Sequence, residues 1–244
     1  MSELSNLKVL NTDQVQAFDT EYVDDIRWTI VENLINRDFP DGSFKFIDMG
    51  GGNGIFADRI LKHYPHSTGV VYDLSETLIA KNKPDSRKIL ICDSLENISQ
   101  YDECAKADLV FLNWVLHHLV SSSRKKTLHN ITNTLTKASG MLSDKGRISV
   151  FENMYDGLLF DGLPSRLIFM LTSSKALAPL VRKLGANTAG CGVCMLSHRT
   201  WNHMFVLAGL QVFDYTDDHP WPVSLLRRTL LHIGRLRVGH YWAK

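Results

Sequence analysis

A glycine-rich turn is the part of the sequence best suited to hold a ligand. Residues 48–54 read Asp-Met-Gly-Gly-Gly-Asn-Gly, follow an apolar run at 44–47 and precede a helical pattern that begins at Ile55. Glycines let the backbone turn sharply and approach a ligand closely, and a helix N-terminus presents unpaired N–H groups. Asp73 lies about 20 residues past the last glycine, where a carboxylate can accept hydrogen bonds from ribose hydroxyls. The turn is therefore predicted to hold a nucleotide-like cofactor.

The spacing of the glycines bears on the kind of nucleotide. Gly50-x-Gly52-x-Gly54 has a spacing associated with S-adenosylmethionine enzymes, whereas dinucleotide-binding proteins favour G-x-G-x-x-G/A. Residues 52–57, with Ala57 in the third place, also fit the dinucleotide pattern. The turn alone leaves three interpretations open, namely a methyl-donor cofactor, a nicotinamide cofactor and a tight turn without a ligand.

Strands and helices alternate around this turn. Apolar runs predict strands at 44–49, 68–72, 88–92, 108–113 and 146–152. Helical patterns separate them, the clearest at 124–141. Strands rich in Val, Ile, Leu and Phe that alternate with helices predict an α/β fold with a doubly wound, mostly parallel sheet. Ligands in such sheets bind beyond the carboxyl ends of the strands, where the strand order reverses.

Both ends of the chain add elements to this core. Residues 12–36 indicate one or two amphipathic helices, so we expect a helical lid over 1–40 and the main domain over 41–244. Further strands near 210–215 and 237–243 complete seven, with helices near 199–208 and 223–233.

An apolar insertion is expected at about 155–200. Residues 158–184 indicate helical pieces interrupted by Pro164 and Pro179, with many leucines crowded together. Ordinary core packing explains such a pattern, and a helical lid over an apolar substrate would give the same one.

Composition excludes several classes of protein. The chain has 244 residues, 44% of them hydrophobic and 22% charged, which is typical of one large globular domain. Its formal net charge of +1 indicates neither a nucleic-acid partner nor a membrane partner, and the arginines at 227–237 are interpreted as a solvated helix face. No secretion signal or membrane span is evident, so the cytoplasm is expected. Cys191 and Cys194 have redox or metal spacing, but without a second such pair we expect ordinary thiols and no metal.

Several further motifs follow the glycine turn in order. Tyr64-Pro65 is followed by Gly-Val-Val-Tyr-Asp-Leu at 69–74, then by Ala-Asp-Leu-Val-Phe-Leu-Asn-Trp-Val-Leu-His-His at 107–118. Gly-Arg-Ile-Ser-Val-Phe-Glu at 146–152 and His-Arg-Thr at 198–200 come later. This order resembles the class I S-adenosylmethionine-dependent methyltransferases, and more narrowly the small-molecule O-methyltransferases that include plant caffeate and flavonoid enzymes. The resemblance covers about residues 44–213 and makes the nicotinamide interpretation a distant alternative.

The resemblance implies a Rossmann-like fold with S-adenosylmethionine as cofactor and S-adenosylhomocysteine as product. By position in the motifs, Asp73 would hold the ribose and Asp93 the adenine amino group. The family has a lysine where this chain has Asn113. The complete set of implied cofactor contacts is Asp48, Gly50, Gly52, Gly54, Asp73, Leu74, Asp93, Ser94 and Asn113.

The resemblance also implies a catalytic pair. His117 matches the family's base, which removes a proton from the acceptor hydroxyl, and Glu152 matches the acid that orients the imidazole. Imidazoles titrate near pH 6.5 and suit this task, and a carboxylate on the other ring nitrogen fixes the tautomer. His198 replaces a glutamate of the family, so it is a second candidate for binding the substrate or accepting the proton.

The expected acceptor is a hydroxyl of a small, aromatic, natural-product-like molecule. A nitrogen or carbon acceptor is the near alternative, and a non-methylating protein that binds the same cofactor is a further one. The candidate substrate contacts are Phe18, Tyr22, Trp114, His118 and Arg199. Only about 45 residues precede the turn, so we expect this chain to lack the family's winged-helix dimerisation domain and to be a monomer or homodimer.

Overall fold

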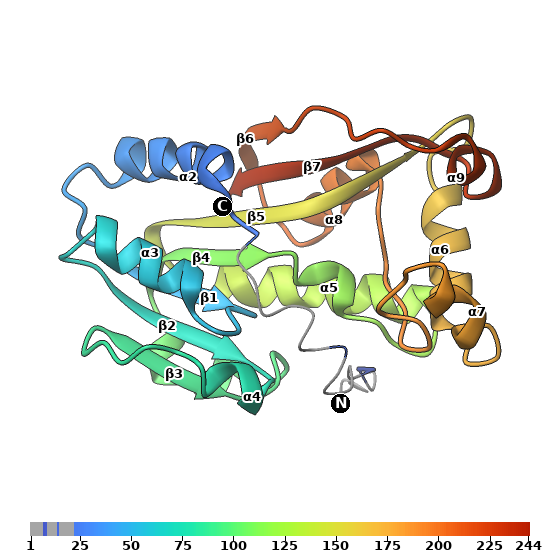
Figure 1. The fold of residues 1–244 in the computed structure, drawn as a ribbon. Helices are drawn as coiled ribbons and strands as arrows, with labels where there is room; N and C mark the ends of the chain where they lie inside the picture. Colours follow the sequence, from blue (N-terminus) through green and yellow to red (C-terminus); the bar gives the residue numbers. More distant parts are fainter. Residues whose placement is uncertain (1–6, 9–13, 15–21) are drawn as a thin grey trace.

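A seven-stranded sheet forms the centre of the molecule. The computed structural model describes residues 7–8, 14 and 22–244, so the candidate Phe18 lies outside the described residues. The strands are β1 (Lys45–Met49), β2 (Thr68–Asp73), β3 (Lys88–Cys92), β4 (Ala107–Asn113), β5 (Leu142–Gly157), β6 (Val212–Asp217) and β7 (Ile233–Ala243). Their order is β3-β2-β1-β4-β5-β7-β6, and β7 runs antiparallel to both of its neighbours, β5 and β6. The prediction of a mostly parallel, seven-stranded sheet is confirmed (Figure 1).

Helices cover both faces of this sheet. They are α2 (Asp25–Asp38), α3 (Ile55–His63), α4 (Glu76–Ile79), α5 (Arg124–Gly140), α6 (Leu163–Ser173), α7 (Ala178–Lys183), α8 (His198–Leu207) and α9 (Leu225–Leu230). Side chains of α2 and α3 pack with one face of the strands, and side chains of α5 and α8 pack with the other. Neighbouring strand residues such as Val70 and Val71 therefore enter different hydrophobic clusters, as expected for a sheet that is covered twice.

The two halves of the sheet meet between β1 and β4. Strand order reverses there, because β2 and β3 continue on one side while β5, β7 and β6 continue on the other. The segment after β1 is the glycine turn, and the segment after β4 is a short 3₁₀ helix, Leu116–His118. Parallel strands present their carboxyl ends at one edge, so this reversal brings the two segments to the same crevice.

Several element boundaries differ from the sequence-based predictions. Pro164 and Pro179 lie in the first turns of α6 and α7, so they begin the two helices rather than interrupt them. A proline fits there because its missing N–H would have no partner in that turn. Strand β5 continues five residues past Glu152, because β7 pairs with it along its length from Ile148 to Gly157. Helix α9 is correspondingly shorter than predicted, since the chain already enters β7 at Ile233.

The N-terminal part of the chain serves the sheet and the crevice. Helix α2, which falls within the expected lid, buries Trp28, Val31 and Ile35 against one face of the sheet. Tyr22 precedes that helix and reaches the cavity described below. Within the part of the chain that the structure describes, no helix combines the length and apolar character needed to cross a bilayer.

Candidate active site

A cavity of about 1270 Å³ lies at the carboxyl ends of the parallel strands. Its polar wall comes from the turn after β1 and from the ends of β2, β4 and the middle of β5. Its apolar wall comes from α6, α7, α9 and the segments around them. Pockets for drug-sized ligands occupy about 300–1,000 Å³, so this volume is sufficient for two molecules side by side.

The glycine turn forms one side of the polar wall. The Gly50 N–H donates to the Tyr72 carbonyl over 2.6 Å, and the Gly52 N–H donates to Asp73 Oδ2 over 3.1 Å. An added Cβ would lie 2.3 Å from Val115 at Gly50 and 1.8 Å from Asn82 at Gly54, and both glycines have positive φ. A Cβ at Gly52 would meet nothing closer than 3.3 Å.

The three predicted glycines differ in whether they line the cavity. Gly50 and Gly52 line the cavity, whereas Gly54 faces Asn82 and shapes the turn from behind. Asp48 and the neighbouring Gly51 also line the cavity. The turn therefore presents backbone to the cavity where the sequence predicted a ligand.

Asp73 closes β2 beside the turn and is held by backbone donors. Its Oδ1 accepts from the Ser75 N–H over 2.7 Å, and its Oδ2 accepts from Gly52. Burial raises the pKa of Asp73, and hydrogen bonds from the backbone of Ser75, Gly52 and Leu74 oppose that shift. Each carboxylate oxygen can accept a further hydrogen bond. Asp73 and Leu74 both line the cavity, so this carboxylate fits a contact to a diol such as a ribose.

Asp93 is placed differently from the prediction. Its carboxylate accepts from the Ser94 N–H over 2.6 Å and from Asn97 Nδ2 and the Tyr101 hydroxyl over 2.9 Å each. Donation by Asn97, Tyr101 and Ser94 lowers the pKa of Asp93. Ser94 and Leu95 line the cavity, whereas Asp93 does not. Asp93 thus fixes the loop that carries Ser94 and Leu95 to the cavity wall.

Asn113 ends β4 and lines the cavity. Its Nδ2 and Oδ1 are shielded from solvent, and neither has a hydrogen-bond partner within the described part of the chain. An unsatisfied buried polar group costs about 1–3 kcal/mol. A ligand in the cavity could satisfy these atoms only if the side chain turned towards it, because protein atoms cover them. The residue lies in the cavity wall at the position where the resemblance implies a cofactor contact.

His117 and Glu152 form a buried hydrogen-bonded pair. Nδ1 of His117 lies 2.7 Å from Glu152 Oε2, and the backbone N–H of His117 donates to Oε1 over 3.2 Å. Glu152 is fully buried on β5, and His117 lines the cavity from the 3₁₀ helix after β4. The Cys194 N–H holds the His117 carbonyl over 2.9 Å. The structure therefore brings together the two residues that the resemblance paired. Because Nδ1 of His117 contacts Glu152, the other ring nitrogen of His117, Nε2, takes no part in this pair.

Trp114, Tyr22 and His118 line the cavity next to this pair. Trp114 has a φ of +55°, and its ring stacks on Phe151 at a centroid distance of 5.3 Å. The centroid of the Tyr22 ring lies 5.6 Å from that of the Trp114 ring. A left-handed backbone is costly for tryptophan and is a mark of functional sites when the surroundings enforce it. Burial and the neighbouring His117 hold the pKa of His118 well below its usual value.

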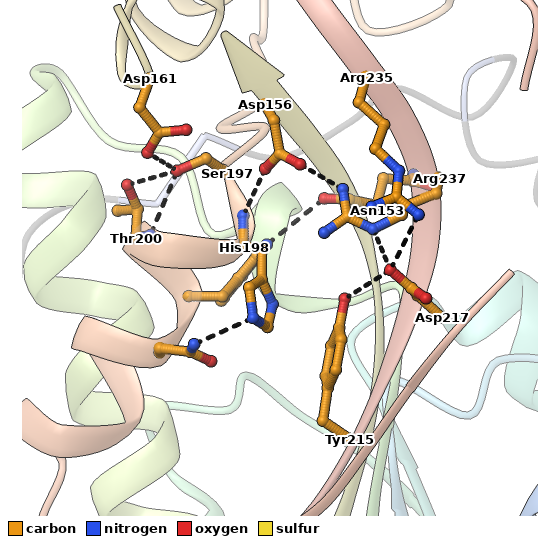
Figure 2. Close-up of polar contacts among 12 residues, drawn as sticks. Asn153, Asp156, Asp161, Ser197, His198, Thr200, Tyr215, Asp217, Arg235 and Arg237 are labelled. Carbon is orange, nitrogen blue, oxygen red and sulfur yellow. Dashed lines mark hydrogen bonds and ion pairs between the residues drawn. The ribbon is translucent and has the colours of Figure 1, made fainter. Parts of the chain in front are cut away.

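His198 lies in a separate network (Figure 2). Its Nδ1 lies 3.0 Å from the Tyr241 hydroxyl, and its Nε2 lies 3.1 Å from Asn202 Nδ2. Its backbone N–H donates to Asp156 over 2.9 Å. Burial and the nearby Arg237 lower the pKa of His198. The side chains of Asp156 and Asp217 bind Arg237 from both sides.

The structure does not bring His198 or Arg199 to the cavity. Glu152 and Asp156 both belong to β5, and four strand residues span about 13 Å. The backbone N–H of His198 is held at the Asp156 end of this stretch, and neither His198 nor Arg199 lines the cavity. Arg199 follows on α8 and is exposed to solvent. The polar network and the His117–Glu152 pair are therefore distinct sites on one strand.

Comparison with known proteins agrees with this geometry. A family model described as an O-methyltransferase domain matches residues 12–158. The chain belongs to this O-methyltransferase domain family. The matched range contains the glycine turn, Asp73, Asn113, His117 and Glu152, and it ends before α6.

Curated relatives of this chain have the names of different methyltransferases. The 3-aminomethylindole N-methyltransferase of Hordeum vulgare subsp. vulgare is 31% identical over 99 residues, which cover 40% of this chain and 24% of that protein. The cephaeline 6′-O-methyltransferase CiOMT of Carapichea ipecacuanha is 25% identical over 145 residues, which cover 59% of this chain and 37% of that protein. The chain thus spans roughly a quarter to two-fifths of the length of these curated relatives.

The fold is shared with a solved structure. A SAM-dependent methyltransferase from Leishmania major superposes with a TM-score of 0.55 at 13% identity, and the match covers 95% of this chain and 82% of that one. At this identity the likeness shows the fold alone. It confirms the expected Rossmann-like methyltransferase fold.

Sequence reasoning missed part of the wall of this O-methyltransferase domain. Asn153 lines the cavity and accepts from Trp114 Nε1 over 3.3 Å. Leu226 and Leu230 of α9 line it as well, although about 75 residues separate them from Glu152. The crowded leucines at 158–184 were a signal for the α6–α7 wall. The segment that contains α9 carried no comparable signal, because its role depends on how β7 returns to β5.

Proposed function

We propose that the chain is an S-adenosylmethionine-dependent methyltransferase whose acceptor is a hydroxyl of a small, largely apolar, aromatic molecule. The observation that carries this proposal is the buried His117–Glu152 pair, with Nδ1 and Oε2 2.7 Å apart, in the wall of a cavity that also contains the glycine turn. Membership of the O-methyltransferase domain family supports the reaction class.

The residues on the polar side fit the cofactor. Asp73 would hold the ribose hydroxyls, and Ser94 and Leu95 would contact the adenine ring. A turn of the Asn113 side chain would bring its amide, which has no partner in the described chain, to the cofactor. Gly50 and Gly52 would let the amino-acid portion approach the backbone. When bound, S-adenosylmethionine supplies a methyl group on a positively charged sulfur.

His117 would accept the proton that the acceptor hydroxyl loses. With Nδ1 engaged by Glu152, the imidazole presents Nε2 as its free acceptor, and the carboxylate stabilises the positive charge that the ring then carries. The backbone contacts of His117 to Glu152 and Cys194 fix the ring at the end of β4. This pair therefore needs no movement to serve as a base.

The remaining wall supports an apolar, flat acceptor. The rings of Trp114 and Tyr22 offer aromatic surface at one side, and side chains of α6, α7 and α9 offer aliphatic surface at the other. Aromatic rings favour offset or tilted contacts with one another. An apolar wall also excludes water from the acceptor oxygen.

The test combines ligand binding with turnover. Calorimetric titration should show binding of S-adenosylhomocysteine and not of NAD. Methyl transfer to a panel of phenols, matched amines and matched carbon acids should select phenols. His117→Ala should lower kcat by about 10²–10⁴ and leave affinity for S-adenosylhomocysteine unchanged, since general bases contribute on that scale.

His198→Ala is the matched control, because it removes an imidazole outside the cavity and should keep its turnover. Preference for amines would move the acceptor from oxygen to nitrogen. Full activity of His117→Ala would remove the base from the mechanism. Binding of the cofactor without transfer to any acceptor would indicate a non-methylating protein.

A further inference from the structure

Helix α9 buries none of its side chains, although half of them are leucines. Leu225, Leu226 and Leu230 are 77%, 66% and 66% exposed. A helix in a folded domain is normally held by an apolar face that it buries. Packing in the core of this domain therefore does not explain why α9 contains these leucines.

The exposed leucines of α9 continue into a larger apolar surface at the cavity opening. Leu226 and Leu230 both line the cavity and face solvent, and so do Met170 of α6, Leu180 of α7 and Leu184 just after it. We call these five residues and Leu225 the mouth surface. Figure 1 shows α6, α7 and α9 together at one end of the molecule, away from α3 and β3. Exposed apolar surfaces of this kind mark interaction sites.

The charge of the same segments is one-sided. Helices α6, α7 and α9 contain no Asp or Glu, and their charged residues are Arg166, Arg182, Lys183, Arg227 and Arg228. Arg182 and Lys183 follow Leu180 on α7, and Arg227 and Arg228 follow Leu226 on α9, all four exposed. The formal net charge of +1 for the whole chain conceals this concentration of cations.

We propose that the mouth surface docks on an anionic lipid bilayer. Leucines that enter the headgroup boundary together with arginines and lysines that contact anionic headgroups are the combination that holds peripheral helices on membranes. A second copy of this chain is a poorer occupant, because a two-fold contact through this surface would set the cations of α7 and α9 against their own copies. The charge complementarity therefore favours an anionic lipid surface.

Docking in this way would place the opening of the cavity against the bilayer. An apolar acceptor dissolved in the lipid could then enter between α7 and α9 without crossing water. The proposal concerns binding to lipid and holds whether or not the acceptor atom is oxygen. Its failure can therefore be distinguished from a failure of the proposed methyl transfer.

The experiment is co-sedimentation of the 244-residue chain with vesicles. Vesicles of phosphatidylcholine with phosphatidylglycerol should carry the protein down, vesicles of phosphatidylcholine alone should carry much less, and added salt should weaken the binding. Leu225→Ser should lower the partition coefficient about tenfold, and Arg228→Gln about fivefold. Neither residue lines the cavity, so affinity for S-adenosylhomocysteine should be unchanged in both.

Two matched variants on other surfaces are the controls. Val206→Ser removes a 70% exposed apolar side chain from α8, and Lys62→Gln removes an exposed cation from α3. Both should bind vesicles like the unmodified chain. Equal binding by all four variants, or no binding to anionic vesicles by the unmodified chain, would overturn the proposal. Self-association that Leu225→Ser abolishes, without vesicle binding, would assign the surface to a second copy instead.

Discussion

Two histidines that contact acidic residues of β5, His117 and His198, differ in what surrounds their ring nitrogens. His117 uses Nδ1 for Glu152 and faces a cavity, next to an amide of Asn113 that has no partner in the described chain. His198 has both ring nitrogens within hydrogen-bond distance of protein groups, Tyr241 and Asn202. Both sites pair a histidine with polar neighbours. In His117 only Nδ1 has such a contact, whereas in His198 both Nδ1 and Nε2 have one. The two imidazoles therefore differ in how many of their ring nitrogens contact other groups in the described chain.

The largest effect is expected from breaking the structural network at Arg237. This side chain is 3% exposed and lies between Asp156 and Asp217. Arg237→Met keeps the volume but leaves two carboxylates without their cation, so the free energy of unfolding should fall by about 3–5 kcal/mol. Chemical denaturation measures it.

Arg235→Met is the control for that variant. Its guanidinium lies 3.6 Å from Asp217 and the side chain is 46% exposed, so its loss should cost under about 1 kcal/mol. Turnover of the folded fraction of Arg237→Met should match the unmodified chain. A specific loss of turnover in that fraction would show that the network contributes to the chemistry.

Asp73→Asn tests the cavity rather than the His198 network. The change removes a charged acceptor from the cavity, so affinity for S-adenosylhomocysteine should fall by about 1.5–3 kcal/mol. Burial raises the pKa of Asp73, so the unmodified chain should already lose affinity as pH falls at values where an exposed aspartate is still ionised. Calorimetry across acidic pH measures both effects. An identical pH dependence in Asp73→Asn would remove Asp73 from the site.

His240 provides a third imidazole, which is buried on β7 and has no charged partner among the described residues. Its Nε2 lies 2.9 Å from Ser149 Oγ, and burial lowers its pKa to about 3. Because this pKa lies below that of the unfolded chain, the unfolded state binds more protons between the two values. As the pH is lowered below about 6.5, the free energy of unfolding should therefore decrease. His240 contributes up to about 1.4 kcal/mol per pH unit to this decrease. His240→Gln should show a shallower slope in denaturation measured from pH 7 to pH 5.

The smallest effect is expected from His198→Gln. Glutamine can replace the contacts to Tyr241 and Asn202, so the free energy of unfolding should change by about 1 kcal/mol or less. Turnover should remain within the error of the assay, and the pH dependence of turnover should be unchanged. A collapse of turnover here, with His117→Gln still active, would exchange the roles of the two histidines.

The glycine turn and the strand pattern were predictable because they are local. Gly50 and Gly52 require positive φ, and the apolar runs of β1, β2 and β4 are buried on both faces, so each signal sits within a few residues. The pairing of His117 with Glu152 came from the order of motifs in a resemblance. The geometry agrees because β4 and β5 are parallel neighbours, with Asn113 beside Phe151.

The sequence by itself determined the α/β class, the cofactor-side turn and the acid after β2, because each depends on backbone conformation and burial over short stretches. Only the tertiary structure decided that Asp93 supports a loop, that His198 belongs with Arg237, and that α9 borders the cavity. Those placements depend on how β7 pairs along β5 and on which donors surround each side chain. Such contacts join residues far apart in the chain, and no local pattern encodes them.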